Sequence, residues 1–242
     1  MKLLAIADLH LANDEKIDKP MDLFAPGWED HANKLKAAWL DLVTDEDIVL
    51  IPGDISWGLK LEEAIADFDW LHELPGKKLI SKGNHDLWWS RIKYLNSLYD
   101  DIFFLQNESY YIESENIVFC ATRGWLYPGS DEYTEHDEKI YTREIQRLQM
   151  GLDSARKIAP NAELVVALHY PPSDAGARET EFTKILEKHN AKLCVYGHLH
   201  GGVAFGHGIK GQHRGVEYKL VSLDYLGCVP KVIYTSENGF EF

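Results

Sequence analysis

Five short apolar segments of this chain each lead directly into residues that can bind a metal ion. Short segments rich in Val, Ile and Leu, bounded by turn residues, are typical of buried strands. Because the carboxyl ends of parallel strands meet at one edge of an α/β sheet, we expect the residues that follow them to lie together. The segments and these residues are Leu3–Ala7 with Asp8 and His10, Ile48–Ile51 with Asp54, Lys78–Ile80 with Asn84 and His85, Leu164–Leu168 with His169, and Leu193–Tyr196 with His198 and His200.

The residue types and their spacing predict a site for two metal ions. Carboxylates and neutral imidazoles are ligands for Mn, Zn and Fe ions. In extended chain, residues two apart face the same side, so Asp8 with His10, and His198 with His200, can each present two ligands to one site. Eight ligand-type groups are too many for one tetrahedral ion, and they suit two ions that hold a hydroxide and a phosphate between them. We expect Asp54 to be the carboxylate that bridges the two ions.

Helical patterns alternate with the strands in the first part of the chain. Apolar spacing predicts helices within residues 29–43, 61–71, 137–158 and 179–188, and a hairpin turn over 112–117. The tail over 217–234 has the pattern of two or three strands, broken at 224–227 and at Pro230. This order predicts an α/β protein built on a central sheet or sandwich. We expect one domain over 1–242, and we allow for a cap-like insertion around 87–158.

Composition limits the class of partner and the compartment. The 242 residues include 25 Lys and Arg against 39 Asp and Glu, a net charge of −14, which argues against binding of nucleic acid through a basic stripe. Three cysteines lack a close pair, and Cys120 and Cys194, which lie in apolar runs, are expected to be reduced and buried. The first apolar run is too short for a signal peptide, and none reaches membrane-spanning length. We therefore expect a cytoplasmic protein that does not enter a membrane.

Five motifs run in order from Asp8 to His200: Asp-x-His, Gly-Asp, Gly-Asn-His-Asp, a single His, and Gly-His-x-His. In type and order they resemble the motifs of the calcineurin-like metallophosphoesterases, and the resemblance spans most of the chain. It implies an α/β fold of four layers, α/β/β/α, with two central mixed sheets flanked by helices and the metal ions at their edge. It also implies hydrolysis of phosphate esters with two divalent ions, by analogy Mn²⁺, with Fe, Zn, Ni or Mg as alternatives.

The resemblance also gives each motif residue a role. His85 becomes a phosphate contact or the general acid that protonates the departing alkoxide. Asp86 becomes the carboxylate that orients His85, and Asn84 a contact to the substrate as well as a ligand. The first ion is assigned to Asp8, His10, Asp54 and His200, and the second to Asp54, Asn84, His169 and His198.

One departure from the family pattern bears on the substrate. The Ser/Thr protein phosphatases carry Gly-Asp-x-x-x-Arg-Gly at the second motif, whereas residues 53–58 here are Gly-Asp-Ile-Ser-Trp-Gly. The missing arginine favours small phosphate esters or phosphodiesters over phosphoproteins. Arg123, which follows another apolar run, is a candidate replacement because its planar guanidinium matches phosphate oxygens; the alternative is a surface arginine.

Other aromatic and histidine residues have simpler interpretations. The tryptophans that follow motifs or strand ends could form an aromatic wall for a flat leaving group, but we favour core packing under the loops. Four histidines in charged helical stretches are expected to be solvated, and two in a Gly-rich stretch are expected in a surface loop. The tryptophans are Trp57, Trp88, Trp89 and Trp125, and the histidines are His31, His72, His136 and His189, then His207 and His213.

Each motif alone also has a structural explanation, since Asp8 and Asp54 could cap helices and Asn84 could occupy a turn. Five strand ends would, however, all need ligand-type residues by chance. We expect a phosphohydrolase that cleaves monoesters or diesters of a small molecule or nucleotide by attack of a metal-bridging hydroxide on phosphorus. The alternatives are a non-catalytic scaffold, disfavoured by the complete ligand set, and a nuclease, disfavoured by the charge and by the absence of a Lys/Arg cluster in the sequence.

Overall fold

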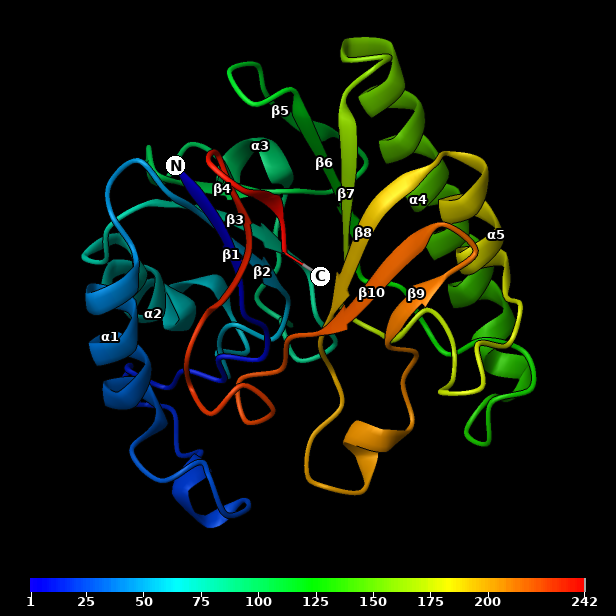
Figure 1. Ribbon diagram of the computed structural model, residues 1–242. Helices are drawn as coiled ribbons and strands as arrows, with labels where there is room; N and C mark the ends of the chain where they lie inside the picture. Colours follow the sequence, from blue (N-terminus) through cyan, green and yellow to red (C-terminus); the bar gives the residue numbers. More distant parts are fainter. Residues whose placement is uncertain (242) are drawn as a thin grey trace.

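The computed structural model describes residues 1–241, which form two six-stranded sheets packed face to face between layers of helices (Figure 1). The strand order is β12-β11-β1-β2-β3-β4 in the first sheet and β5-β6-β7-β8-β10-β9 in the second. Each sheet is parallel at its centre and antiparallel at one or both edges. The predicted α/β sandwich of two mixed sheets flanked by helices is confirmed.

The first sheet is formed mainly by the N-terminal third of the chain. Its parallel strands are buried on both faces, which explains why they are continuous apolar runs in the sequence. Helices α1 (His31–Leu42) and α2 (Leu61–His72) pack on its outer face (Figure 1). The strands are β1 (Lys2–Ala5), β2 (Ile48–Pro52), β3 (Lys77–Ser81), β4 (Ile102–Phe104), β11 (Lys231–Thr235) and β12 (Gly239–Phe240), and the short helix α3 (Ile92–Leu95) precedes β4.

The second sheet has its own outer helices and shares an inner apolar layer with the first. Helices α4 (Glu138–Ile158) and α5 (Glu181–Lys188) cover its outer face (Figure 1). Between the sheets, Leu3 and Leu50 of the first sheet belong to one buried cluster with Phe119 and Val165 of the second. The strands are β5 (Ser109–Ile112), β6 (Ile117–Thr122), β7 (Glu163–Leu168), β8 (Ala191–Tyr196), β9 (Gly211–His213) and β10 (Val216–Leu220).

Most of the predicted elements are found within a few residues of their expected bounds. The hairpin turn over 112–117 joins antiparallel strands β5 and β6, and all three cysteines are unpaired and buried. The stretch 87–158 supplies β4 to one sheet, β5 and β6 to the other, and α4 to an outer layer, so it is built into the sandwich. Among residues 1–241, no helix is both long and apolar enough to cross a membrane.

Two histidines differ from their predictions. His213 was expected in a surface loop, but it is the half-buried last residue of β9, which pairs with β10. His31 was expected to be solvated, but it is buried at the start of α1, and its Nε2 lies 3.0 Å from the carbonyl oxygen of Leu9. The charged residues of α1 lie in the middle of the helix and on its exposed face. The first turn instead packs against the loop that follows β1, where an apolar environment and one carbonyl partner suit a neutral imidazole.

Candidate metal centre

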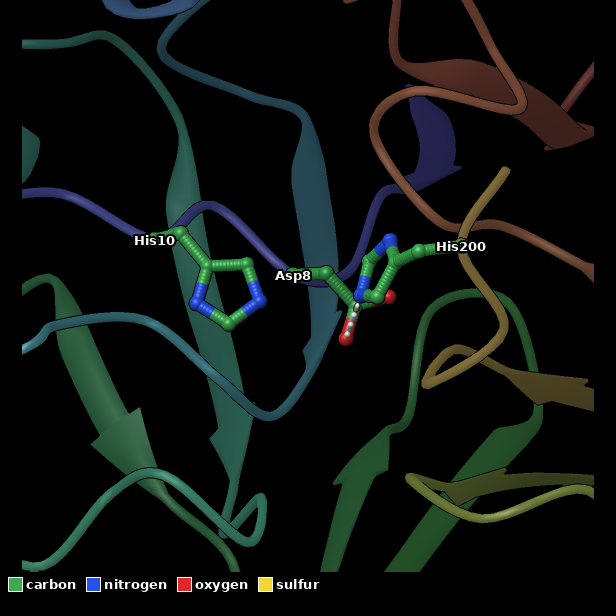
Figure 2. Close-up of side chains that lie close together, drawn as sticks. All are labelled: Asp8, His10 and His200. Carbon is green, nitrogen blue, oxygen red and sulfur yellow. Dashed lines mark ion pairs between the residues drawn. The ribbon is translucent and has the colours of Figure 1, made fainter. Parts of the chain in front are cut away.

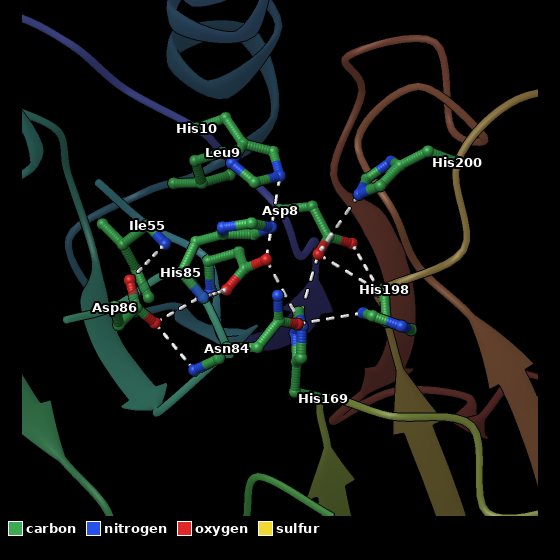
Figure 3. Close-up of polar contacts among 12 residues, drawn as sticks. Asp8, Leu9, His10, Ile55, Asn84, His85, Asp86, His169, His198 and His200 are labelled. Carbon is green, nitrogen blue, oxygen red and sulfur yellow. Dashed lines mark hydrogen bonds and ion pairs between the residues drawn. The ribbon is translucent and has the colours of Figure 1, made fainter. Parts of the chain in front are cut away.

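The residues predicted as metal ligands lie together at one end of the sandwich (Figure 3). They come from the loops after β1, β2 and β3 in the first sheet and after β7 and β8 in the second. Both sheets direct the carboxyl ends of these parallel strands toward the same end of the molecule, as the pattern of strand ends predicts. Asp8, His10, Asp54 and His169 are almost completely buried.

The loops reach this position through left-handed backbone, not through extended chain. The φ angles of Asp8, His10, Asp54 and His198 are 62°, 45°, 53° and 72°. The two-residue spacing therefore brings ligands together through tight bends of the backbone, and not through extended chain as predicted. Non-glycine residues adopt this conformation at a cost of about 1–2 kcal/mol each, and such strain is concentrated at functional sites.

Glycine allows the loops after β2 and β3 to approach each other. A Cβ atom added to Gly83 would lie 2.0 Å from Asp54 Oδ1, and one added to Gly53 would lie 2.5 Å from the backbone nitrogen of Gly83. Any larger residue at either position would push the two loops apart. The glycines thus set the distance between the Asp54 carboxylate and the Gly-Asn-His-Asp loop.

A first group of possible ligands consists of Asp8, His10 and His200 (Figure 2). His200 Nε2 lies 3.6 Å from Asp8 Oδ1, and His10 Nε2 lies 3.8 Å from Asp54 Oδ2. These separations are too long for hydrogen bonds. They are close to the distance between two ligand atoms of one metal ion, because two atoms that each lie about 2.1 Å from an ion are separated by about 3.0–3.4 Å.

A second group consists of Asp8, Asp54 and His169, with Asn84 and His198 beside it. His169 Nε2 lies 3.4 Å from Asp54 Oδ2 and 2.7 Å from Asn84 Oδ1, and His198 Nδ1 lies 3.0 Å from the same amide oxygen. Asp54 Oδ2 is therefore near an imidazole nitrogen of each group, which is the position that a bridging carboxylate requires. Asp8 also belongs to both groups.

The charges of these residues fit two divalent cations. Burial alone would raise the pKa of Asp54, but the neighbouring His169 lowers it below its usual value, and two buried carboxylates are then ionised side by side. Although burial opposes it, Asp54 and Asp8 raise the pKa of His169 to about 9, and Asp8 and Asp224 raise that of His200 to about 10. Protons on these two imidazoles balance the carboxylates, and cations would displace them.

The buried ring of His10 supports the same conclusion. Burial lowers the pKa of His10 to about 4, so this imidazole is neutral, as a metal ligand must be. Its Nε2 faces the Asp54 carboxylate from 3.8 Å, which is too far for a hydrogen bond. A neutral imidazole nitrogen that faces buried carboxylates without a hydrogen bond fits the position of a metal ligand.

Two hydrogen bonds fix the orientation of the ligand imidazoles. The Nδ1–H of His169 donates to the carbonyl oxygen of Pro52 at 2.9 Å, and the Nδ1–H of His200 donates to Asp224 Oδ1 at 3.0 Å. Each bond leaves Nε2 facing the centre, an arrangement common around protein metal ions. Asp224 was missed in the sequence, although it follows β10, another parallel strand of the second sheet, and the pattern of strand ends could have found it.

Replacing Asp224 with asparagine is expected to weaken metal binding by about 10- to 100-fold, because the imidazole of His200 loses its charged partner. Titration calorimetry of the metal-free protein with Mn²⁺ measures this change. The variant Glu237→Gln, at an exposed position, serves as the control for loss of one negative charge. Equal Mn²⁺ affinities for the wild type and the Asp224 variant would contradict the role of Asp224.

Asp86 does not orient His85, so this part of the prediction was wrong. Its carboxylate is fully buried and accepts hydrogen bonds from the two loops that carry Asp54 and Asn84. Asp86 thus joins the Gly-Asp loop to the Gly-Asn-His-Asp loop (Figure 3). The donors are the backbone N–H groups of Gly83, Asp54 and Ile55, at 2.7, 2.9 and 2.9 Å, and the indole N–H of Trp88, at 3.1 Å.

Replacing Asp86 with alanine is expected to lower the free energy of unfolding of the metal-free protein by about 3 kcal/mol, because several buried N–H groups lose their acceptor. Urea denaturation without metal measures this loss. Asp86→Asn retains one acceptor oxygen and is expected to lose less. If the alanine variant is as stable as the wild type, Asp86 does not hold the two loops together.

His85 lies at the edge of the metal centre, and its side chain is not held by a hydrogen bond within the described residues. Its backbone N–H donates to Asp54 Oδ1 at 2.8 Å, which places the residue beside the ligands. The residue is exposed, and its ring is 4.5 Å from the ring of Trp57 and 5.6 Å from that of His10, centroid to centroid. Partial desolvation by these neighbours is the main cause that lowers its pKa. Within residues 1–241 its imidazole nitrogens make no hydrogen bond, so they are available to a ligand.

The tryptophans divide between core and site. Trp88 is buried in the core, as predicted. Trp57 instead stacks on His10 with 4.6 Å between ring centroids, and Trp125 lines a cavity of about 720 Å³ beside His198 and His200. His207, which was expected in a surface loop, is exposed and lines the same cavity. This volume is within the range of small-molecule sites.

Arg123 is not a free surface residue. Its guanidinium lies 4.3 Å from the centroid of the Trp125 ring, and its Nη2 lies 3.5 Å from Oε1 of Glu144. Its backbone carbonyl accepts hydrogen bonds from the N–H groups of His169 and Tyr170, so the residue is directly behind a predicted ligand. Contact between Arg123 and a substrate phosphate stays a prediction.

Three comparisons relate the chain to known proteins. A crystal structure of a protein of unknown function, AQ665 from Aquifex aeolicus, aligns with 96% of this chain and 95% of its own, at 17% identity and a TM-score of 0.47. The Gene 66 protein of Mycobacterium phage L5 is 34% identical over 80 residues, which cover 33% of this chain and 37% of the phage protein. Residues 1–202 match the family model of the calcineurin-like phosphoesterases. With this match over most of its length, the chain belongs to the calcineurin-like phosphoesterase family.

Proposed function

We propose that this protein is a metal-dependent phosphohydrolase that cleaves monoesters or diesters of a small organic phosphate or nucleotide. The observation that carries the proposal is the place of Asp54 Oδ2, which lies 3.8 Å from Nε2 of His10 and 3.4 Å from Nε2 of His169. One carboxylate oxygen between two imidazoles suits a pair of ions. When bound, two divalent cations activate water for attack on phosphorus and neutralise the charge of the phosphate.

The residues of the chain then have distinct tasks. Asp54 and Asp8 supply the negative charge that holds the cations, and the histidines complete their coordination. The Asn84 amide, which is within 3.0 Å of two of these imidazoles, is placed to serve as a ligand and to contact the phosphate. His85, with its free ring nitrogens, is placed to donate a proton to the departing oxygen.

A substrate panel tests the proposal directly. Removal of metal with a chelator is expected to abolish hydrolysis of p-nitrophenyl phosphate or bis-p-nitrophenyl phosphate, and addition of Mn²⁺ is expected to restore it. Metal analysis of the purified protein gives the stoichiometry, for which we expect two ions per chain. Hydrolysis that persists without metal would contradict the mechanism, and no hydrolysis of either ester with two bound ions would favour the non-catalytic scaffold.

A further inference from the structure

A cluster of four basic side chains gathers around one buried acid beside the metal centre. We call Lys82, Arg123, Arg143 and Arg147 the basic cluster; the acid is Glu144, which is fully buried. Glu144 Oε1 lies 2.8 Å from Arg147 Nη1, 3.5 Å from Arg123 Nη2 and 3.6 Å from Arg143 Nε. The positive charges of Arg123 and Arg147 also reach Lys82, whose pKa is lowered first by burial.

The sequence contains no long run of Lys and Arg residues, so the basic cluster exists only in three dimensions. The members are far apart in the chain: Lys82 follows β3 of the first sheet, Arg123 follows β6 of the second, and the other two lie on α4. Only the packing of the two sheets brings them together. In a chain with a net charge of −14, a local excess of three positive charges is unusual.

The charges of the basic cluster are incompletely paired. The Nε of Arg123 is buried and has no hydrogen-bond partner among residues 1–241. The half-buried Lys82 has no ion pair or hydrogen bond through its side chain in the same described part of the chain. Glu144 balances only one of these positive charges, and the remaining like charges repel each other at a partly buried position, so this arrangement is typical of a site that binds a negative ligand.

The basic cluster is joined to the metal centre on one side and to the cavity on the other. Lys82 directly precedes the loop that carries Asn84, and the carbonyl of Arg123 holds the backbone N–H of His169. The guanidinium of Arg123 also stacks on Trp125, which lines the cavity of about 720 Å³. The basic cluster thus adjoins the metal ligands through the backbone of Lys82 and Arg123, and it adjoins the wall of the cavity through the ring of Trp125.

We propose that the basic cluster binds a second anionic group of the substrate, a phosphate or a carboxylate, while the reacting phosphate lies at the metal ions. The inference rests on the proposed function. Two divalent cations already neutralise the reacting phosphate, so the excess charge of the basic cluster is available to another group. The substrate class is thereby narrowed to organic phosphates that carry two separate anionic groups, which arginine and lysine bind through charge-assisted hydrogen bonds.

Binding of phosphonates, which the enzyme cannot hydrolyse, tests this proposal without relying on turnover. The probes are propylphosphonate, with one anionic group, and 3-phosphonopropionate and propane-1,3-diphosphonate, each with two. Titration calorimetry of the Mn²⁺-loaded protein is expected to show at least one of the latter binding about tenfold or more tightly than propylphosphonate, which corresponds to about 1.4 kcal/mol. Lys82→Gln and Arg123→Gln are each expected to remove most of that gain, and Lys82→Gln is expected to leave propylphosphonate binding nearly unchanged.

The control is Lys157→Gln, which removes one positive charge from an exposed position on the same helix, ten residues or about 15 Å beyond Arg147. It is expected to keep the full gain. Lys82 has no protein partner, so its variant is expected to fold even if loss of Arg123 disturbs Glu144. The proposal is overturned if all three probes bind equally, if the gain survives both substitutions, or if the substitutions weaken propylphosphonate equally. Loss of hydrolysis without loss of this binding pattern would reject the proposed function alone.

Discussion

Replacement of Asp54 by asparagine is expected to reduce kcat/KM for any hydrolysed phosphate ester by about a thousandfold or more, equivalent to about 4 kcal/mol of transition-state stabilisation. The reason is geometric: one carboxylate oxygen lies near the imidazoles of both His10 and His169, so its loss disturbs both ion positions at once. An asparagine has nearly the same shape but no charge. The fold is therefore expected to persist while the pair of ions does not.

Two measurements separate this effect from unfolding. The metal-free variant is expected to unfold cooperatively, but at a lower temperature than the metal-free wild type, because the lowered pKa of Asp54 means that its charge stabilises the folded protein through His169. The increase in Tm on addition of Mn²⁺ is expected to shrink sharply. Asp41→Asn, an exposed substitution on α1, is the matched control and should change neither quantity. Wild-type activity and metal content in Asp54→Asn would refute the bridging role.

Replacement of His85 by asparagine is expected to have an effect that depends on the leaving group. A positioned general acid contributes about 10²- to 10⁴-fold, and it matters most when the departing oxygen is a strong base. An alkyl phosphate is expected to lose this full factor in kcat. A p-nitrophenyl ester, whose leaving group departs without a proton, is expected to lose about tenfold or less.

The contrast between the two ester types is the decisive measurement. Metal content is expected to stay at the wild-type value, because the His85 side chain is outside both groups of possible ligands. Phe substitution of Trp57, which packs 4.5 Å from His85 without titrating, is the comparison for a purely packing effect. An equal loss of activity for alkyl and p-nitrophenyl esters would show that His85 contacts the phosphate without donating a proton.

The positions of the strands in the chain and the assembly of the predicted ligands followed from a local rule. Strands buried on both faces are continuous apolar runs, so their ends can be found in the sequence, and parallel strands bring those ends to one edge. The rule requires no knowledge of which strands are neighbours. This is why Asp8 and His198, 190 positions apart, were expected together and are joined by a hydrogen bond from His198 N to Asp8 Oδ2 at 3.0 Å.

Other features depend on contacts that have no local pattern. Asp86 was predicted to act on its neighbour His85, but its partners include N–H groups of a loop about 30 positions earlier. His31 was predicted to be solvated because its helix is charged, but it is buried by the loop after β1. The left-handed bends at Asp8 and Asp54 are imposed by close approach between loops, which sequence spacing does not report.

The two sheets contribute to the centre in a way that ties metal uptake to the completion of folding. The carboxylates Asp8 and Asp54 follow strands of the first sheet, whereas His169, His198 and His200 follow strands of the second. The hydrogen bond from His169 to the carbonyl of Pro52 also crosses between the sheets. Neither half of the chain can form the centre by itself, so cations are expected to bind only after both halves have docked. Bound cations then stabilise the docked state and slow the separation of the two halves.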